Sequence, residues 1–276
     1  MRPTIAQKRE TFRRLHEGGC FVMPNPWDVG SALALQDLGF EALASTSAGM
    51  AWAHGRPDTG VDLETDLSHL RALVEAVDLP VNADFEGGYA VAPEGVAANV
   101  RRAVDTGVAG LSIEDSTGDP QAPLYDFDLA VQRVAAARAA IDSAGGEVLL
   151  TARSEGFIAG RPDLDETLRR LTTFARAGAD CLFAPGLREA GDIEAVVRAV
   201  APKPVNVLTL GQPVAELAEL GVRRISVGGS LARTAWGAFL KAAREVAGQG
   251  TFQAFEDAAP SAELNALFDG RNGESL

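Results

Sequence analysis

Apolar residues along the chain gather in eight short runs separated by longer amphipathic stretches. Several of the runs are continuously apolar rather than alternating, which is typical of parallel strands covered by helices. Between two of them, residues 63–77 repeat leucine and valine at helical spacing and form one apolar stripe. The pattern therefore predicts alternating strands and helices. The expected strands are residues 20–24, 41–45, 80–84, 110–115, 148–153, 181–185, 204–208 and 224–228.

Glycines recur at the ends of the predicted helices. Gly39, Gly107, Gly178 and Gly221 each precede an even-numbered strand, where glycine can adopt the left-handed conformation that caps a helix. This weak repeat over eight strand-helix units favours a closed (β/α)8 barrel of the TIM type over an open doubly wound sheet. No Gly-x-Gly-x-x-Gly motif follows the first strand, so a dinucleotide-binding fold has no support.

The length of 276 residues fits one barrel domain, 1–276, with no linker that would separate a second domain. Within it we expect an N-terminal helix in residues 1–19, the barrel core in 20–230 and a C-terminal helical extension in 231–276. The extension continues past the last strand, and it either caps the barrel or reaches a neighbouring subunit.

Composition narrows the class of partner. A formal charge of -13 disfavours binding to nucleic acid or to an anionic membrane, so we expect a small molecule. Cys20 and Cys181 stand beside apolar runs, which favours two free thiols over a disulfide. The first residues lack the apolar stretch of a signal peptide, and no later segment has about 18 consecutive apolar residues. These features predict a soluble cytoplasmic protein.

Acidic side chains stand where the barrel strands are expected to end, which is where barrel enzymes place their working residues. Asp84 and Glu86 follow the third strand and Glu114 closes the fourth. Their like charges need a cation or a proton when they converge. Carboxylates without histidine or thiolate favour Mg2+, or Mn2+, over zinc. The alternative is that these acids pair with arginines or face solvent.

Two further groups stand at strand ends. Arg153 closes the fifth strand, where a guanidinium can bind a substrate carboxylate; a salt bridge to Glu155 or Glu114 is the alternative. The run Ser45-Thr46-Ser47 follows the second strand and offers donors to a carboxylate or enolate oxygen, although such runs are also common in ordinary turns.

Three motifs occur together and in order: Asp84-Phe-Glu-Gly-Gly-Tyr89, Ser112-Ile-Glu-Asp115 and Thr151-Ala-Arg-Ser-Glu-Gly-Phe157. In these the chain resembles the isocitrate lyase and phosphoenolpyruvate mutase superfamily, from about Phe21 through the eighth strand. The joint occurrence of the three motifs is more specific than any one of them.

The resemblance implies a barrel that binds Mg2+ directly through Asp84, with Glu86 and Glu114 acting mainly through metal-bound waters. It also implies that Asp58 lies near the substrate, that Ser45, Thr46 and Ser47 hold a carboxylate, and that Arg153 contacts the substrate. Family members make or break bonds beside the carbonyl of a 2-oxo acid through an enolate. They commonly assemble as dimers of dimers by exchanging a C-terminal helix, which predicts a homodimer or homotetramer here.

The chain departs from the family pattern at two places. Glu86 stands where a second Asp is usual, and residues 116–125 contain none of the Cys, Lys or His of the loop Lys-Lys-Cys-Gly-His in isocitrate and methylisocitrate lyases. That segment also lacks the Lys and Asn of phosphonopyruvate-processing members. His54 and Tyr125 are candidates to replace the missing acid, and each could equally be an ordinary surface residue.

We therefore expect a Mg2+-dependent lyase that breaks a carbon-carbon bond in a 2-hydroxy or 2-oxo di- or tricarboxylate, with Asp58 and Arg153 as catalytic residues. One alternative keeps the metal and the enolate for carbon-phosphorus chemistry or for hydrolysis or decarboxylation of a 2-oxo acid such as oxaloacetate. A third possibility is a barrel that binds 2-oxo acids without catalysis.

Overall fold

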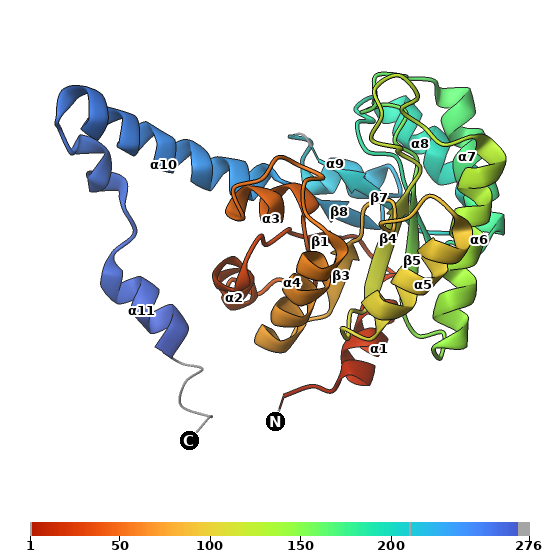
Figure 1. The fold of residues 1–276 in the computed structure, drawn as a ribbon, viewed down its shortest axis with the longest axis horizontal. Helices are drawn as coiled ribbons and strands as arrows, with labels where there is room; N and C mark the ends of the chain where they lie inside the picture. The colour runs from red at the N-terminus through yellow and green to blue at the C-terminus, as the bar shows by residue number, and fades with distance from the viewer. Residues whose placement is uncertain (1, 210, 270–276) are drawn as a thin grey trace.

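The computed structural model describes residues 2–209 and 211–269. Eight parallel strands form a nearly closed barrel in the order β1-β8-β7-β6-β5-β4-β3-β2, which confirms the expected (β/α)8 class (Figure 1). Each apolar run predicted as a strand contains one. The strands are β1 Phe21–Met23, β2 Leu43–Ala44, β3 Val81–Asp84, β4 Gly110–Glu114, β5 Leu149–Arg153, β6 Cys181–Phe183, β7 Val205–Leu208 and β8 Arg224–Ser226.

Helices surround the barrel and extend it at both ends, as expected (Figure 1). The helices are α1 Ile5–Leu15, α2 Val29–Asp37, α3 Ser47–Ala53, α4 Leu63–Ala76, α5 Pro93–Val104, α6 Phe127–Ser143, α7 Leu164–Arg176, α8 Ala190–Val200, α9 Val214–Glu219, α10 Ser230–Gln249, the 3-10 helix η1 Gln253–Asp257 and α11 Ser261–Asp269. Residues 270–276 of the predicted extension lie outside the described residues. No helix in the described part of the chain is long and apolar enough to cross a membrane.

Two side-chain and backbone contacts close the barrel where β1 and β2 share no ladder. The amide of Ala44 donates to the carbonyl of Pro24 at 3.0 Å. Asn25 donates through Nδ2 to the carbonyl of Ser45 at 2.8 Å, and its Oδ1 accepts from the amides of Val227 and Gly228 at 2.9 Å each. Asn25 therefore ties the carboxyl ends of β1, β2 and β8 together.

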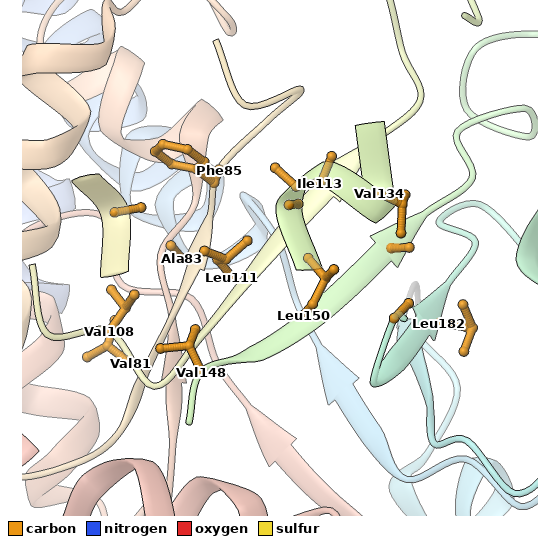
Figure 2. Packing of buried hydrophobic residues seen from close by; sticks show 14 of the residues in the cluster. Val81, Ala83, Phe85, Val108, Leu111, Ile113, Val134, Val148, Leu150 and Leu182 are labelled. Carbon is orange, nitrogen blue, oxygen red and sulfur yellow. The ribbon is translucent and has the colours of Figure 1, made fainter. Parts of the chain in front are cut away.

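The larger apolar core lies between the strands and the helices. Outward-facing residues of neighbouring strands, such as Leu111, Ile113 and Leu150, pack beside Val134 of α6 (Figure 2). The leucines at 67, 70 and 73 of the predicted stripe on α4 are fully buried in the same core. Burial of this apolar surface fixes which strand residues point inward, and so which can reach the barrel axis.

A second, smaller core closes the barrel from below, at the amino ends of the strands. Phe12 of α1 is fully buried there against Phe21 and Met23 of β1. Gly110 of β4 makes room for it, because a Cβ at this position would lie 2.6 Å from the Phe12 ring and 2.6 Å from Asn82 Oδ1. The N-terminal helix thus plugs the amino end of the barrel.

Local details bear on the sequence predictions. The four helix-ending glycines all have positive φ, between 85° and 108°, as the repeat predicts. Cys20 and Cys181 are both free thiols. The run after β2 is not a loop: Thr46 is the N-cap of α3, and Ser47 is that helix's first residue.

Candidate functional site

Asp84 is held at the end of β3 by the start of α3. Its Oδ2 accepts from both the amide and the hydroxyl of Ser47 at 3.0 Å, and its own amide donates to Ser45 Oγ at 2.8 Å. The Ser47 amide is free for this contact because the first amides of a helix have no partner within it. The predicted residues Ser45, Ser47 and Asp84 therefore come together, while the hydroxyl of Thr46 caps its own helix.

Arg153 lies at the centre of the acidic cluster. Its guanidinium contacts Asp84 Oδ1 at 2.6 Å, Glu155 Oε1 at 2.9 Å and Glu114 Oε2 at 3.2 Å. Burial alone would lower the pKa of Arg153, but the charges of Glu155, Glu114 and Asp84 raise it well above its usual value. The salt bridges that the sequence left open as an alternative are therefore present, and Asp84 and Glu114 do pair with an arginine.

The acids around Arg153 outnumber the one guanidinium among them. Burial, followed by the charges of Asp84 and Asp58, raises the pKa of Glu86 to about 7. Burial also raises the pKa of Glu114 well above its ordinary value, although the nearby Arg153 opposes that rise. Bringing a further cation to the cluster would relieve this repulsion.

Asp115 supports the cluster from outside. Its Oδ1 accepts from the amide of Glu155 at 2.8 Å, and its Oδ2 contacts Arg170 of α7 at 3.2 Å. Asp115 and Glu155 are both buried, so this link holds the ends of β4 and β5 in fixed relation. The side chains of Glu114, Arg153 and Glu155 are thereby oriented.

Asp58 lies on the loop between α3 and α4, as expected for a residue near the mouth. Its Oδ1 accepts from the amide of Thr59 at 3.0 Å, and Thr59 has a φ of 62°. Partial burial, followed by the charge of Asp84, raises the pKa of the Asp58 carboxyl.

The segment 116–125 folds back on itself as a small hairpin. Ser116 and Leu124 form an antiparallel bridge, and the amide of Thr117 donates to the carbonyl of Pro123 at 3.0 Å. Between this segment and the loop after β3 lies a cavity of about 270 Å³, lined by Glu86, Glu114, Tyr89 and Tyr125 among others. Tyr125 thus faces the site, whereas His54 turns its Nδ1 to the carbonyl of Met50 at 2.9 Å, within its own helix.

A narrower cavity of about 100 Å³ runs down the barrel axis beneath Asp84 and Arg153. Its inner wall is polar and includes Asn82, Asn206 and Arg224, which our sequence prediction missed. Their positions inside apolar strands suggested core residues. A detectable signal was the repeated Pro-Val-Asn at the start of β3 and β7, which points both asparagines to the axis.

The donor set at the mouth fits a hard divalent cation, because it consists of carboxylate and hydroxyl oxygens without thiolate or imidazole. Within the described residues, no group of three or more His, Cys, Asp or Glu side chains has the geometry of a metal cage. Glu86 also carries a φ of 45°, a left-handed backbone that is uncommon outside glycine.

Similar solved structures share this architecture. A putative lyase/mutase from Burkholderia cenocepacia J2315 superposes with a TM-score of 0.92 at 48% identity, covering 96% of each chain. The 2,3-dimethylmalate lyase, described as a member of the PEP mutase/isocitrate lyase superfamily, superposes with a TM-score of 0.83 at 25% identity and covers 99% of this chain and 96% of its own.

Several curated proteins are similar to this chain in sequence. An uncharacterised protein of Mycobacterium tuberculosis is 34% identical over 77% of this chain and 79% of its own length. A probable 2-methylisocitrate lyase of Corynebacterium glutamicum is 29% identical over 83% and 76%, and an oxaloacetate decarboxylase of Bradyrhizobium diazoefficiens is 30% identical over 70% and 68%. The family model for phosphoenolpyruvate phosphomutase matches residues 12–247. The chain therefore belongs to the phosphoenolpyruvate phosphomutase family, within the isocitrate lyase/PEP mutase superfamily.

Proposed function

We propose that this protein is a Mg2+-dependent lyase that breaks a carbon-carbon bond in a 2-hydroxy or 2-oxo di- or tricarboxylate through an enolate. The observation that carries the proposal is the cluster in which Arg153 contacts Asp84, Glu114 and Glu155 at the carboxyl ends of neighbouring strands. Family relatives described as a probable 2-methylisocitrate lyase and a 2,3-dimethylmalate lyase support this type of reaction.

In this proposal Asp84 is the direct ligand of Mg2+, or of Mn2+, while Glu86 and Glu114 act through water. The excess of acids over the Arg153 guanidinium supports a further cation, and the oxygen-only donor set supports a hard one. When bound, the ion would supply charge stabilisation for the oxygen that becomes negative as the bond breaks. Asp84 would then exchange its contact with Arg153 for the ion.

The chain's own residues would bind and orient the acid. The hydroxyls of Ser45 and Ser47 lie against Asp84, so a carboxylate held by the segment Ser45-Thr46-Ser47 would lie beside it. Arg153, released from Asp84, would donate to the substrate. Asp58 is the proposed proton carrier, because its raised pKa brings proton exchange closer to neutral pH.

A second candidate is decarboxylation or hydrolysis of a 2-oxo acid of the oxaloacetate type. Segment 116–125 contains no Cys, Lys or His that could remove a proton from a substrate hydroxyl. Decarboxylation of a 2-oxo acid needs no such step, because the bond to the leaving carbon dioxide breaks without removal of a hydroxyl proton. The similarity to an oxaloacetate decarboxylase fits this candidate.

The decisive test replaces Asp84 by Ala and measures two quantities: turnover, and Mn2+ binding by electron paramagnetic resonance. We expect both to be lost together, while Asp105→Ala, at the exposed C-cap of α5, changes neither. Substrates are screened by release of pyruvate, carbon dioxide, oxalate or phosphate from 2-methylisocitrate, 2,3-dimethylmalate, oxaloacetate and phosphonopyruvate. Full activity in the presence of a chelator would contradict the proposal.

We further propose that the protein is a cytoplasmic homodimer or homotetramer. The two free cysteines fit a reducing compartment. Helix α10 leads away from the barrel and carries the partly exposed Trp236, Phe239 and Leu240, which supports a role in contacts between subunits (Figure 1).

A further inference from the structure

Arg224 of β8 lies inside the barrel, below the acidic cluster, and is only 2% exposed. Its Nε donates to Asn206 Oδ1 at 2.8 Å and one terminal nitrogen donates to Thr151 Oγ1 at 2.9 Å. The other terminal nitrogen lies 3.3 Å from His16 Nε2. The Nδ1 of His16 faces the carbonyl of Phe12 at 2.8 Å, which assigns its proton to Nδ1 and makes Nε2 an acceptor.

All three of these contacts are neutral groups, and none of the ion pairs found among residues 2–209 and 211–269 involves Arg224. Burial therefore lowers the pKa of this guanidinium. The contrast is Arg153, one layer higher, which contacts three carboxylates. A buried arginine cation without a counter-ion raises the free energy of the folded protein. An anion bound beside Arg224 would therefore be stabilised.

The cavity on the barrel axis connects this cation to the site above. Arg224 lines its inner end together with the neutral side chains of Asn82, Ser112, Asn206 and Ser226. Among the described residues Asp84 is the one acid that lines the cavity, and it lies at the outer end, where β3 finishes. Amide and hydroxyl groups around one guanidinium suit a carboxylate, because they can donate hydrogen bonds without adding negative charge.

The side of the mouth formed by β6 and β7 is apolar. Phe183, Pro185 and Leu208, with Ile158 from the loop after β5, line the same cavity and offer no cation to a further carboxylate. The volume of about 100 Å³ corresponds to roughly three water molecules of liquid, so only a small group such as a carboxylate with its neighbouring carbon fits between Arg224 and the mouth.

We propose that the inner end of this cavity is a carboxylate subsite with Arg224 as its counter-charge, and that the substrate is a compact 2-oxo or 2-hydroxy acid inserted with one carboxylate towards the barrel axis. Its reacting carbons then lie at Asp84 and Arg153, and any further substituent at β6 and β7 is short and apolar. The inference rests on the proposed function for the identity of the acid, and it selects compact acids over tricarboxylates.

The test uses Asn206→Asp, which places a carboxylate where Arg224 Nε now meets an amide oxygen, and pyruvate as the probe. Pyruvate binding is measured by calorimetry with and without Mg2+, beside Mn2+ affinity and the unfolding temperature. We expect pyruvate binding to weaken by at least about tenfold, because the introduced carboxylate forms the ion pair with Arg224 that the pyruvate carboxylate would otherwise form. Mn2+ affinity should stay unchanged and the unfolding temperature should rise, because a buried charge has gained its partner.

Gln132→Glu, on an exposed position of α6, makes the same amide-to-acid change outside the cavity and should alter none of these quantities. Arg224→Gln provides a second variant, with the same loss of pyruvate binding expected. Citrate should not compete with pyruvate, because the apolar side at β6 and β7 offers no cation to its further carboxylates.

Equal pyruvate affinity in wild type and folded Asn206→Asp would overturn the subsite, as would a wild type that binds no pyruvate or binds citrate as well. A merely structural Arg224 would change the unfolding temperature and leave pyruvate affinity alone. Failure of the lyase proposal would appear differently, as intact pyruvate binding without turnover of any substrate.

Discussion

His16 lies half-buried between Phe12, Phe21 and Arg224 at the base of the barrel. Burial, with the charge of Arg224, lowers its pKa to about 3 from the ordinary value of 6.5. Between these values the unfolded chain binds a proton at His16 that the folded chain excludes. The contribution of His16 to the free energy of unfolding is therefore fully present above about pH 6.5 and is lost as the pH falls towards 3. The slope is at most about 1.4 kcal/mol per pH unit.

We expect His16→Gln to be less sensitive to acid than wild type. Urea unfolding at pH 7 and pH 5 should show a smaller loss of unfolding free energy in the variant, whatever its stability at pH 7. An unchanged slope in His16→Gln would mean that His16 is not the group that takes up the proton.

Arg133 of α6 is a positioning residue for Glu86. It is 1% exposed and donates to the carbonyls of Gly87, Ala90 and, at 2.7 Å, Val91. The loop that it holds contains left-handed φ values at Glu86, Gly88 and Tyr89, which cost on the order of 1 kcal/mol or more for each residue other than glycine. The guanidinium also lies 4.0 Å from the centre of the Tyr125 ring and so joins the two loops of the site.

Lysine cannot make this set of bonds, so Arg133→Lys should free the loop and displace Glu86. We expect Mn2+ affinity to fall about tenfold and the KM for the organic substrate to change little. Arg138→Lys, the same change further along α6, removes the forked contact to Asp142 and Asp180 and should leave Mn2+ affinity intact. Loss of unfolding temperature alone in Arg133→Lys would reduce Arg133 to a structural role.

Single residues at strand ends were predictable from sequence because the barrel topology assigns them one edge. Asp84, Glu114 and Arg153 come together as that rule requires. Whether Arg153 binds a substrate carboxylate or forms salt bridges could not be predicted, because the spacing of residues along two strands does not determine side-chain rotamers. Arg224 was missed because inward and outward positions look alike within a strand of only three residues.

At the scale of elements, α1 closes the barrel with one aromatic side chain. Phe12 is fully buried, and Gly110 leaves the space that its ring occupies. We expect Phe12→Ala to lower the unfolding free energy by about 3–5 kcal/mol, because it opens a cavity beneath the polar layer. Gly110→Ala should also destabilise the fold, since its Cβ would meet the ring at 2.6 Å.

The two changes should not be additive. In Phe12→Ala/Gly110→Ala the added methyl group enters space that the ring has left, so the double variant should lose less free energy than the sum of the single losses. Chemical denaturation of the four proteins measures this coupling. Strict additivity would show that the ring and Gly110 do not share the space.

Elements were predictable wherever a long apolar pattern supported them. The strands and the buried stripe of α4 follow directly from burial on one face. Helix α3 was missed because its seven residues, Ser47–Ala53, carry no apolar period, and its start is set by the Thr46 cap and by the contact of Ser47 with Asp84. A tertiary contact of this kind leaves no periodic signal in a sequence.

At the scale of the whole molecule, α10 begins beside the site and ends away from the barrel (Figure 1). A Cβ on Gly229 would lie 3.1 Å from the Trp52 ring of α3, and one on Gly49 would lie 3.3 Å from Ala232 of α10. Ala232 is the only buried residue described in this helix of 20 residues, about 30 Å long, while Phe239 is 58% exposed. A long helix with exposed aromatics is more stable when a second subunit covers them.

We therefore expect Trp236→Glu/Phe239→Glu to reduce the molar mass in solution, measured by chromatography with light scattering, to that of a single chain. Lys241→Glu, on the same helix, should leave the assembly unchanged. Because α10 starts at the contact with α3, loss of the assembly should also loosen α3 and weaken the hold of Ser47 on Asp84, seen as faster amide hydrogen exchange in residues 47–53. A wild type that is monomeric, or a variant of unchanged mass, would show that these aromatics do not join subunits.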